Sequence, residues 1–260
     1  MFILLYHQIS SIPLDKDPFH LAVPPDLFEK EMCHLKEAGY ECKPVRYIAE
    51  MMSRSEPVPE NYFAITFDDG YQDNLDVAYP ILKRYGFTAT IFVVPDRVGL
   101  PAKWDGVSEH LGFQLLGWDG IRELAGNGID IGSHTHTHAK LADLSSDRLN
   151  WELITSKTMI ERELGRQIDL FAFPYEHAEE AFHNALKKVG YFAACGSLLY
   201  PESQYNLWRT ECFGSDSMNN FKYKISINWR KSVLFKYHSP LGKFLRNFRR
   251  KFKNTVKTSK

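Results

Sequence analysis

The residues of this chain that could do chemistry fall in two short segments. Asp68 and Asp69 close one apolar run, and His134 and His138, spaced i, i+4, follow another. One Asp with two His is a common ligand set for a catalytic divalent metal. The neighbouring Asp would then be free to act as a general base toward a water that the metal activates. The combination indicates a metal-dependent hydrolase.

Each segment also has a simpler interpretation. Asp-Gly after Asp68 is common in plain turns, and single histidines are usually surface or capping residues. However, two adjacent carboxylates at a buried strand end repel each other and need a cation or a shared proton. Three histidines within five residues, after a strand, are harder to explain by chance. Within that group we expect His136 to be a non-ligand, because alternation in an extended segment turns it away from at least one neighbour.

The zero net charge of the 260 residues hides an asymmetry between two parts of the chain. Residues 221–260 hold 13 Lys and Arg and no Asp or Glu, which leaves 32 − 13 = 19 basic against 32 acidic residues, a net of −13, for residues 1–220. We therefore expect a catalytic domain over 1–220 and a basic tail over 221–260.

Cysteine usage and hydropathy indicate the cellular location of the protein. The four cysteines show no CxxC spacing, which argues against both a Cys-based zinc site and a disulfide framework. The apolar N-terminus is too short for the core of a signal peptide, and no run approaches the roughly 18 apolar residues of a membrane span. We expect a cytoplasmic protein.

Elements of two kinds alternate along the chain. Hydrophobic runs predict strands at 2–6, 62–67, 87–94, 129–132, 170–173 and 191–194. Helical patterns lie at 26–39, with Asp26 as N-cap, and at 74–85, 118–125, 146–164 and 179–189. This alternation is typical of parallel βαβ units in a barrel or an open sheet. The chemical residues follow the C-terminal ends of strands, the edge where such folds build their sites.

Three motifs resemble those of one enzyme family. Residues 66–70, Thr-Phe-Asp-Asp-Gly, resemble the first motif of the polysaccharide deacetylases (the NodB-like proteins of carbohydrate esterase family 4). Residues 134–138 fit the second, H-[ST]-x-x-H, and residues 171–175, Phe-Ala-Phe-Pro-Tyr, resemble the third. The resemblance covers about residues 1–215, with the motifs in the family's order.

The resemblance implies a fold and a metal. It implies a distorted (β/α) barrel with seven parallel strands, which suits the alternation of the elements. It also implies that Asp69, His134 and His138 bind a divalent metal, with zinc the expected ion. Asp68 would be the general base.

The resemblance implies a reaction as well. Asp68 would take the proton of a water that attacks an N-acetyl carbonyl carbon. Pro174 and Tyr175 would lie at the substrate, with the backbone N–H of Tyr175 stabilising the oxyanion. An acid must finally protonate the departing amine.

The chain departs from the family pattern at the third motif. Ala172 stands where the family usually has an arginine that orients the base. A cation near Asp68 would still help to keep it ionised. Arg209 is our candidate for that role, and a surface arginine in a loop is the equally open alternative.

A second departure concerns the acid. The family's last motif supplies a histidine from a late apolar strand, and no convincing copy follows Tyr191. His238 follows an apolar run but lies in the basic tail. His7 is the better candidate, because it ends the first strand at the predicted active-site edge.

The tail carries an amphipathic pattern over 241–254. Its large apolar residues lie on one helical stripe, with Lys and Arg around it: Leu241, Phe244, Leu245, Phe248 and Phe252. This pattern is typical of a helix on an anionic membrane, where each basic residue contributes about 1 kcal/mol. A disordered solubilising tail is an alternative. Nothing in the catalytic body supports nucleic-acid binding, so none is expected.

These observations lead to a function hypothesis. We expect a deacetylase of an N-acetylated amino sugar, acting on a lipid- or nucleotide-linked intermediate of surface polysaccharide or lipopolysaccharide synthesis, in the cytoplasm and peripheral on the inner face of the membrane. A glycan-binding protein with an impaired site on the same fold is the alternative. Haloacid-dehalogenase-like phosphate transfer would need Asp-x-Asp and has no use for the histidine pair.

Overall fold

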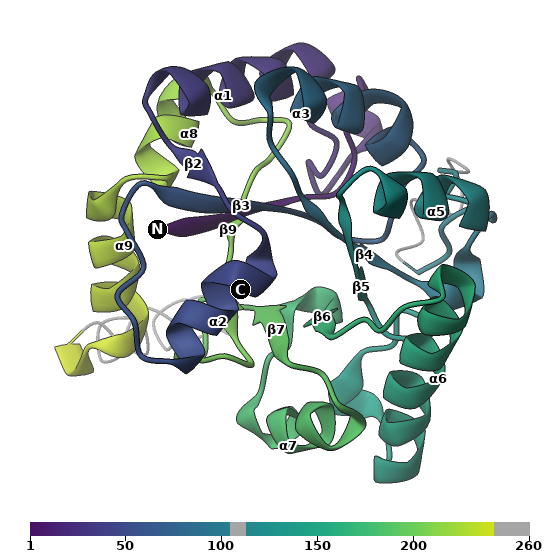
Figure 1. Ribbon diagram of the computed structural model, residues 1–260. Helices are drawn as coiled ribbons and strands as arrows, with labels where there is room; N and C mark the ends of the chain where they lie inside the picture. Colours follow the sequence, from purple (N-terminus) through teal and green to yellow (C-terminus); the bar gives the residue numbers. More distant parts are fainter. Residues whose placement is uncertain (105–112, 242–260) are drawn as a thin grey trace, which may run out of the picture. The chain divides into compact units, whose positions relative to one another are not determined.

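The computed structural model describes residues 1–104 and 113–241 (Figure 1). The chain divides into two compact units, Met1–Met218 and a second that begins at Asn219, slightly before the expected boundary at 220/221. In the described part, no helix is long and apolar enough to cross a membrane. The tail helix expected over 241–254 lies outside the described residues, apart from Leu241.

The first unit is built on a parallel sheet that curls into a nearly closed barrel. Its strands are β1 (Phe2–Tyr6), β2 (Glu41–Cys42), β3 (Tyr62–Phe67), β4 (Thr90–Val93), β5 (Asp130–Ser133), β6 (Leu170–Ala172), β7 (Ala193–Gly196), β8 (Leu207–Trp208) and β9 (Thr210–Glu211). They pair in the order β8-β7-β6-β5-β4-β3-β1-β9, with β2 added beside β3. The predicted barrel is thus confirmed, but the described residues form nine strands, three of them of two residues each, where seven were expected.

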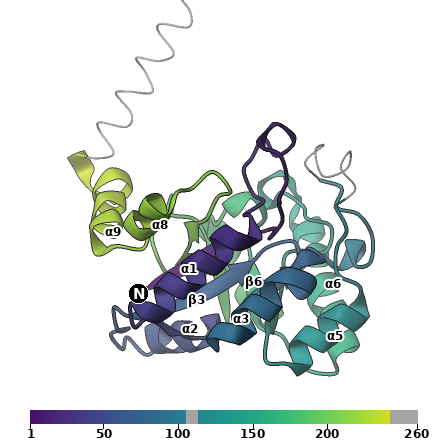
Figure 2. The same cartoon turned by 90° about the horizontal axis from the view of Figure 1, so that it is seen from above.

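Helices surround the strands of this unit. They are α1 (Pro25–Glu37), α2 (Val45–Ser53), α3 (Tyr79–Tyr85), α5 (Trp118–Gly126), α6 (Ser146–Leu164) and α7 (Glu180–Val189). The second unit holds α9 (Ile227–Val233), and α8 (Met218–Lys224) spans the boundary between the units. Figure 2 shows α1 and α3 side by side, in agreement with their contacts.

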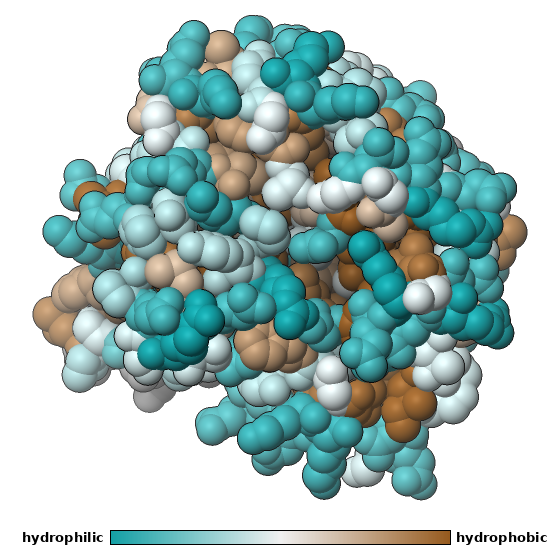
Figure 3. Space-filling model, in the orientation of Figure 1, coloured by the Kyte–Doolittle hydropathy of each residue, from teal (hydrophilic) through white to brown (hydrophobic). Residues whose placement is uncertain are grey.

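Apolar residues close one end of the barrel. Helix α2 contributes Val45, Ile48 and Ala49 to a buried cluster that also contains Ile3 and Ala64, from the first halves of β1 and β3. The face of the molecule in Figure 3 is largely hydrophilic, with hydrophobic residues mostly in recesses. Because this end is filled, the opposite end, at the strand C-termini, is the one left for a site.

Helix α1 begins differently from the sequence prediction. Pro24, not Asp26, occupies the N-cap, and proline also opens the first turn, where its missing N–H costs no hydrogen bond. Asp26 instead pairs with Lys30 one turn later, at 3.1 Å. One face of the helix is apolar and buried, since its buried residues include Phe28, Met32 and Leu35.

The predicted helix over 74–85 is split. A π-helical turn over Asn74–Ala78 precedes α3, and Gly86 ends the helix in the left-handed conformation, at φ 68°. The buried side chain of Asn74 donates a hydrogen bond to the carbonyl oxygen of His7, at 2.9 Å. The turn therefore fixes the backbone just after β1.

The barrel closes at a single residue. Strand β8 pairs with β7, β9 pairs with β1 at the opposite end of the strand order, and only Arg209 separates β8 from β9. Leu4 faces Thr210 in this register. The chain therefore passes from one edge of the sheet to the other at Arg209, whose side chain is buried.

Candidate active site

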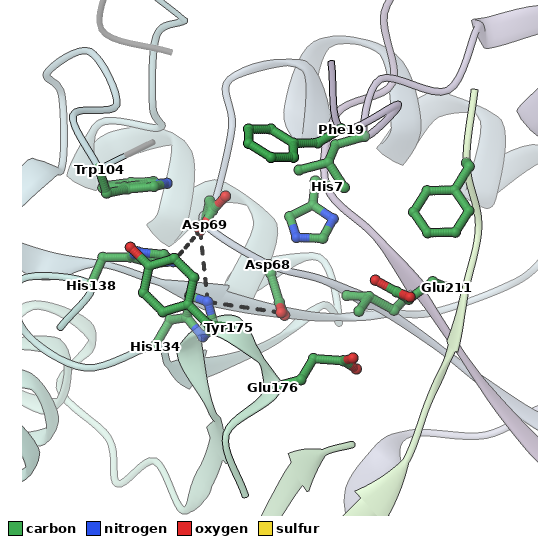
Figure 4. Close-up of a pocket in the computed structure, with 13 residues that line it drawn as sticks. His7, Phe19, Asp68, Asp69, Trp104, His134, His138, Tyr175, Glu176 and Glu211 are labelled. Atoms are coloured by element: carbon green, nitrogen blue, oxygen red, sulfur yellow. Dashed lines mark hydrogen bonds and ion pairs between the residues drawn. The ribbon is translucent and has the colours of Figure 1, made fainter. Parts of the chain in front are cut away.

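The strand ends bring the predicted site residues together. Asp68 and Asp69 follow β3, His134 follows β5, and Tyr175 follows β6 (Figure 4). The backbone N–H of Asp68 donates a hydrogen bond to the carbonyl oxygen of Tyr6 at 3.0 Å. The hydrogen-bond pattern between β1 and β3 therefore continues to Asp68, the first residue after β3. The positions of these side chains are thus set by strand pairing rather than by free loops.

Asp69, His134 and His138 form a cluster that fits a metal ion. All three are buried, and their ligand atoms lie within 4.8 Å of one another. The Oδ1 atom of Asp69 is 3.3 Å from Nε2 of His138 and 3.7 Å from Nε2 of His134. That oxygen is buried without a hydrogen-bond partner. An orphaned carboxylate oxygen facing two imidazole nitrogens is a donor set suited to a divalent cation.

The surroundings of His134 prepare it as a ligand. Its Nδ1 lies 2.9 Å from the carbonyl oxygen of Ala172, which can only accept, so Nδ1 carries the proton and Nε2 offers its lone pair to the cluster. Burial lowers the pKa of His134 to about 4, because it disfavours the charged imidazolium more than the nearby carboxylates favour it. His134 is therefore neutral at neutral pH.

Asp69 and His138 complete the cluster. Burial alone would raise the pKa of Asp69, but the close imidazole of His138 and the other nearby histidines outweigh it, so the pKa lies below its ordinary value. The ring of Trp104 stacks on His138, with centroids 4.4 Å apart, and the Tyr175 hydroxyl lies 3.3 Å from Nδ1 of His138. These neighbours fix the ring plane of His138.

A buried carboxylate holds the histidine segment in place. Glu152 of α6 is fully buried and accepts hydrogen bonds from the backbone N–H groups of His136 and Thr137, both at 2.9 Å. The segment needs this support, because Thr135 (φ 64°) and His138 (φ 59°) are both left-handed. Sequence reasoning missed Glu152, although an acid beside the apolar stripe of a helix was a usable signal.

His136 lies outside the cluster, as expected. Its ring makes an edge contact with Trp151, with centroids 4.8 Å apart, and its backbone N–H is bound by Glu152. The structure thus separates His136 from its two neighbours in the motif, His134 and His138.

Arg209 forms a bidentate ion pair with Asp68. Its two terminal nitrogens lie 2.7 and 2.8 Å from the two carboxylate oxygens. Arg209 is 1% exposed and Asp68 3%, so the surface interpretation of Arg209 is wrong. Burial alone would raise the pKa of Asp68, but the guanidinium of Arg209 and His134 outweigh it, and the net pKa is below its ordinary value.

His7 also reaches the site. It lies in the pocket with Asp68 and Asp69, and the side chain of Asn74 holds its carbonyl. Figure 4 shows its ring on the opposite side of Asp68 from Glu176. His238, the other candidate of the sequence analysis, belongs to the second unit.

The cluster opens into a cavity of about 460 Å³. Its walls combine the site residues with aromatic and acidic ones: Leu5, His7, Phe19, Leu21, Asp68, Asp69, Trp104, His134, His138, Tyr175, Glu176, Glu211 and Phe213. Sequence reasoning missed Glu176 and Glu211. The available signal was their position, one directly after the third motif and the other two residues after Arg209.

Comparisons with known proteins identify the family of the chain. A family model described as polysaccharide deacetylase matches residues 55–194. YxkH of Bacillus subtilis (strain 168), which carries the same family name, is 33% identical over 189 residues, or 73% of this chain and 61% of that protein. A poly-beta-1,6-N-acetyl-D-glucosamine N-deacetylase of Escherichia coli (strain K12) is 22% identical over 220 residues, 72% of this chain and 32% of the relative.

The chain therefore spans less than two thirds of the length of both curated relatives. Among solved structures, the deacetylase PplD of Streptococcus pyogenes in complex with acetate has a TM-score of 0.73, at 24% identity, over 87% of this chain and 98% of that one. This likeness shows a shared fold.

The cluster predicts how metal content responds to substitution. His134→Ala should reduce bound metal to well below one ion per chain, because it removes one of three ligands and the hydrogen bond that orients it. His136→Ala is the matched control and should keep its metal, since His136 lies outside the cluster. Elemental analysis after dialysis measures both. Equal metal in His134→Ala and the parent protein would contradict the assignment.

The buried ion pair predicts a coupling between two substitutions. Arg209→Met should lower the free energy of unfolding by about 3–5 kcal/mol, because it leaves the Asp68 carboxylate buried without its cation. Adding Asp68→Asn should recover part of this loss, since the amide carries no charge. The difference in the free energy of unfolding between the parent protein and Arg209→Met should become smaller as pH falls. The reason is that protonation of Asp68 in the variant removes the uncompensated charge. Denaturant unfolding of the parent, the two single variants and the double variant measures the coupling. Additive effects of the two substitutions on the free energy of unfolding would refute it.

Proposed function

Because the chain belongs to the polysaccharide deacetylase family, we propose that its pocket hydrolyses the amide of an N-acetylated amino sugar. The observation that carries the proposal is the pairing of a metal-ligand cluster with an adjacent carboxylate, Asp68, that Arg209 holds buried and ionised. The reaction adds water across the amide C–N bond and releases a carboxylate and an amine.

We propose zinc as the ion held by Asp69, His134 and His138. The neutral Nε2 of His134 and the orphaned Oδ1 of Asp69 would suit its preference for nitrogen and oxygen donors. When bound, the ion supplies Lewis acidity, which polarises the substrate carbonyl and lowers the pKa of water in the site.

Asp68 is the general base of this proposal. Its carboxylate accepts one proton from the attacking water, and the fork of Arg209 keeps both oxygens in a fixed plane while it does so. Oxygen of the water bonds to the carbonyl carbon, whose oxygen gains negative charge. The backbone N–H of Tyr175, in the turn after Pro174, stabilises that charge.

His7 is proposed as the acid that protonates the departing nitrogen. Its position in the pocket beside Asp68 and Asp69 supports this role, and the hydrogen bond from Asn74 anchors its backbone. As the C–N bond breaks, the nitrogen takes the proton and leaves as a free amine.

The substrate class is an N-acetylhexosamine in a glycan. One relative is named for deacetylation of poly-beta-1,6-N-acetyl-D-glucosamine, and the aromatic walls of the pocket suit the apolar faces of sugar rings. We further propose a lipid- or nucleotide-linked intermediate of surface polysaccharide or lipopolysaccharide synthesis, met in the cytoplasm. We disfavour a glycan-binding protein with an impaired site, because the proposed base Asp68, its partner Arg209 and the ligand cluster all lie together.

A peripheral membrane position would bring the protein to such a substrate. The second unit exposes large apolar side chains: Tyr223 (55%), Ile227 (48%), Leu234 (42%), Phe235 (50%) and Leu241 (57%). Residues 221–260 also carry 13 basic and no acidic residues. Exposed apolar groups among positive charges are suited to the surface of an anionic bilayer.

The proposed reaction predicts amine release that depends on Asp68. Zinc-loaded protein should release free amine from at least one of a panel of carriers: N-acetylglucosamine oligomers and nucleotide- and lipid-linked N-acetylhexosamines. Asp68→Asn should lower the rate roughly 10²–10⁴-fold, the usual contribution of a general base, while keeping its metal. Turnover by Asp68→Asn equal to the parent, or no amine from any carrier, would refute the proposal.

The membrane proposal predicts binding that depends on the tail. The full chain should sediment with vesicles that contain phosphatidylserine or phosphatidylglycerol and not with purely zwitterionic ones, and 0.5 M salt should weaken the binding through screening. A chain that ends at residue 240 is the matched comparison, and replacing Phe235 by Ser tests the apolar contribution. Equal sedimentation of the full and shortened chains would show that the tail is not the anchor.

A further inference from the structure

Glu176 is a half-buried acid that the proposed amide chemistry does not use. It ends the short 3-10 helix η5 (Pro174–Glu176) and lines the same cavity as Asp68. Figure 4 shows Glu176 on the side of Asp68 away from His7. Among the described residues, none forms a hydrogen bond with its carboxyl group. The group is therefore available to a ligand in the cavity.

The backbone of Glu176 has a conformation that favours glycine. Its φ is 55°, and the residue before it, Tyr175, has a φ of 56°. In this left-handed region a Cβ atom crowds the neighbouring carbonyl oxygen, whereas glycine adopts the same angles freely. Glutamate at this position is therefore strained.

The turn itself does not depend on the glutamate side chain. The backbone N–H of Glu176 donates to the carbonyl oxygen of Phe173 at 3.1 Å, and its own carbonyl oxygen accepts from the N–H of Ala178 at 2.9 Å. Both hydrogen bonds use backbone atoms, which glycine would supply equally well. A strained residue at a candidate active site, with a side chain that the fold does not need, indicates a function for that side chain.

The cavity has room for more than the reacting amide. Its volume of about 460 Å³ is that of a small-ligand site and exceeds what an acetamido group requires. A sugar ring placed there would carry its hydroxyl groups out of water, and each would need a new hydrogen-bond partner. Burial raises the pKa of Glu176 to about 8, so at neutral pH its carboxyl group is mostly protonated and can both donate and accept. A neutral carboxyl group of this kind matches a hydroxyl group.

We propose that Glu176 is a substrate-binding residue that forms a hydrogen bond with a hydroxyl group of the amino sugar whose amide lies at Asp68. The inference rests on the proposed function and deepens it, because the site then recognises the sugar ring as well as the acetamido group. The strain in the backbone is retained because the side chain holds the substrate.

The first experiment separates the backbone strain from the side chain. Glu176→Ala removes the carboxyl group and keeps the strain, whereas Glu176→Gly removes both. In urea unfolding of the zinc-loaded proteins, Glu176→Gly should therefore have a higher midpoint than Glu176→Ala. Ser55 is the matched position, since it is exposed and has a φ of 57°. Ser55→Gly should likewise have a higher midpoint than Ser55→Ala.

The second experiment measures glycan binding without turnover. A tetrasaccharide of N-acetylglucosamine is titrated by ligand-observed NMR into zinc-loaded Asp68→Asn protein, in which hydrolysis is slow. Adding Glu176→Ala or Glu176→Gly should weaken binding roughly tenfold, the scale of a hydrogen bond lost from a partly buried site. Adding Glu176→Gln should preserve most of the affinity, because an amide keeps a donor and an acceptor. Adding Ser55→Gly should leave binding unchanged.

The third experiment identifies the hydroxyl group that Glu176 contacts. N-acetylglucosamine and analogues that each lack one hydroxyl group are titrated into the same zinc-loaded Asp68→Asn protein, with and without Glu176→Ala. One analogue should bind more weakly than N-acetylglucosamine when Glu176 is present and equally well when it is alanine. The reason is that a hydroxyl group and its partner lose the same hydrogen bond, whichever of the two is removed.

The outcomes separate the inference from the function on which it rests. Unchanged tetrasaccharide binding with Glu176→Ala, no binding even with Glu176 intact, or an equal loss with Glu176→Gln and Glu176→Ala overturns the proposed contact. It is also overturned if no analogue couples to Glu176, or if Glu176→Gly is no more stable than Glu176→Ala. Failure of the parent protein to deacetylate a tetrasaccharide that it binds refutes the proposed function, while the binding comparison still decides the contact.

Discussion

The buried ion pair between Asp68 and Arg209 is the constraint on which the rest of the site depends. Removing two charges from water is costly, and the cost is offset only by good geometry, here two parallel bonds of 2.7 and 2.8 Å. Arg209 can reach Asp68 because the chain crosses between the edges of the sheet at that residue, with β8 before it and β9 after it. Residues 207–211, which comprise β8, Arg209 and β9, therefore both close the barrel and orient the candidate base. A change that loosened the closure would also move the guanidinium.

The metal half of the site is rigid for a different reason. Its ligands follow strand ends, but the segment after β5 must turn sharply, and Thr135 and His138 adopt left-handed conformations to do so. Glu152 offsets that strain by accepting hydrogen bonds from two successive backbone N–H groups of the segment. The carbonyl oxygen of Ala172 fixes the orientation of the His134 ring. A small residue at 172 is compatible with this arrangement, because Ala172 contributes only its backbone carbonyl. The cation that orients the base is instead Arg209, which lies between β8 and β9.

The sequence was sufficient for features that depend on near neighbours along the chain. The ligand pattern, the long strands and the span of α6 follow from local spacing, and the structure agrees with them. The two-residue strands β2, β8 and β9 were missed, because so short a run has no periodicity to detect. Arg209 could be named only as a candidate, since its partner lies 141 residues away. Glu176 and Glu211 were overlooked because they end elements of only two or three residues, which have no detectable periodicity, and single acids usually face solvent.

The two aspartates of the pocket differ in the source of their compensating charge. Asp68 is paired with Arg209 at 2.7 and 2.8 Å, so the chain itself supplies its cation. Asp69 instead faces the imidazoles of His134 and His138, and burial keeps His134 neutral at neutral pH. A bound divalent cation would complete the charge balance at Asp69, whereas Arg209 keeps Asp68 ionised whether or not an ion is bound. The ionisation of the candidate base is therefore set independently of the metal, although the two carboxylates are neighbours in the chain.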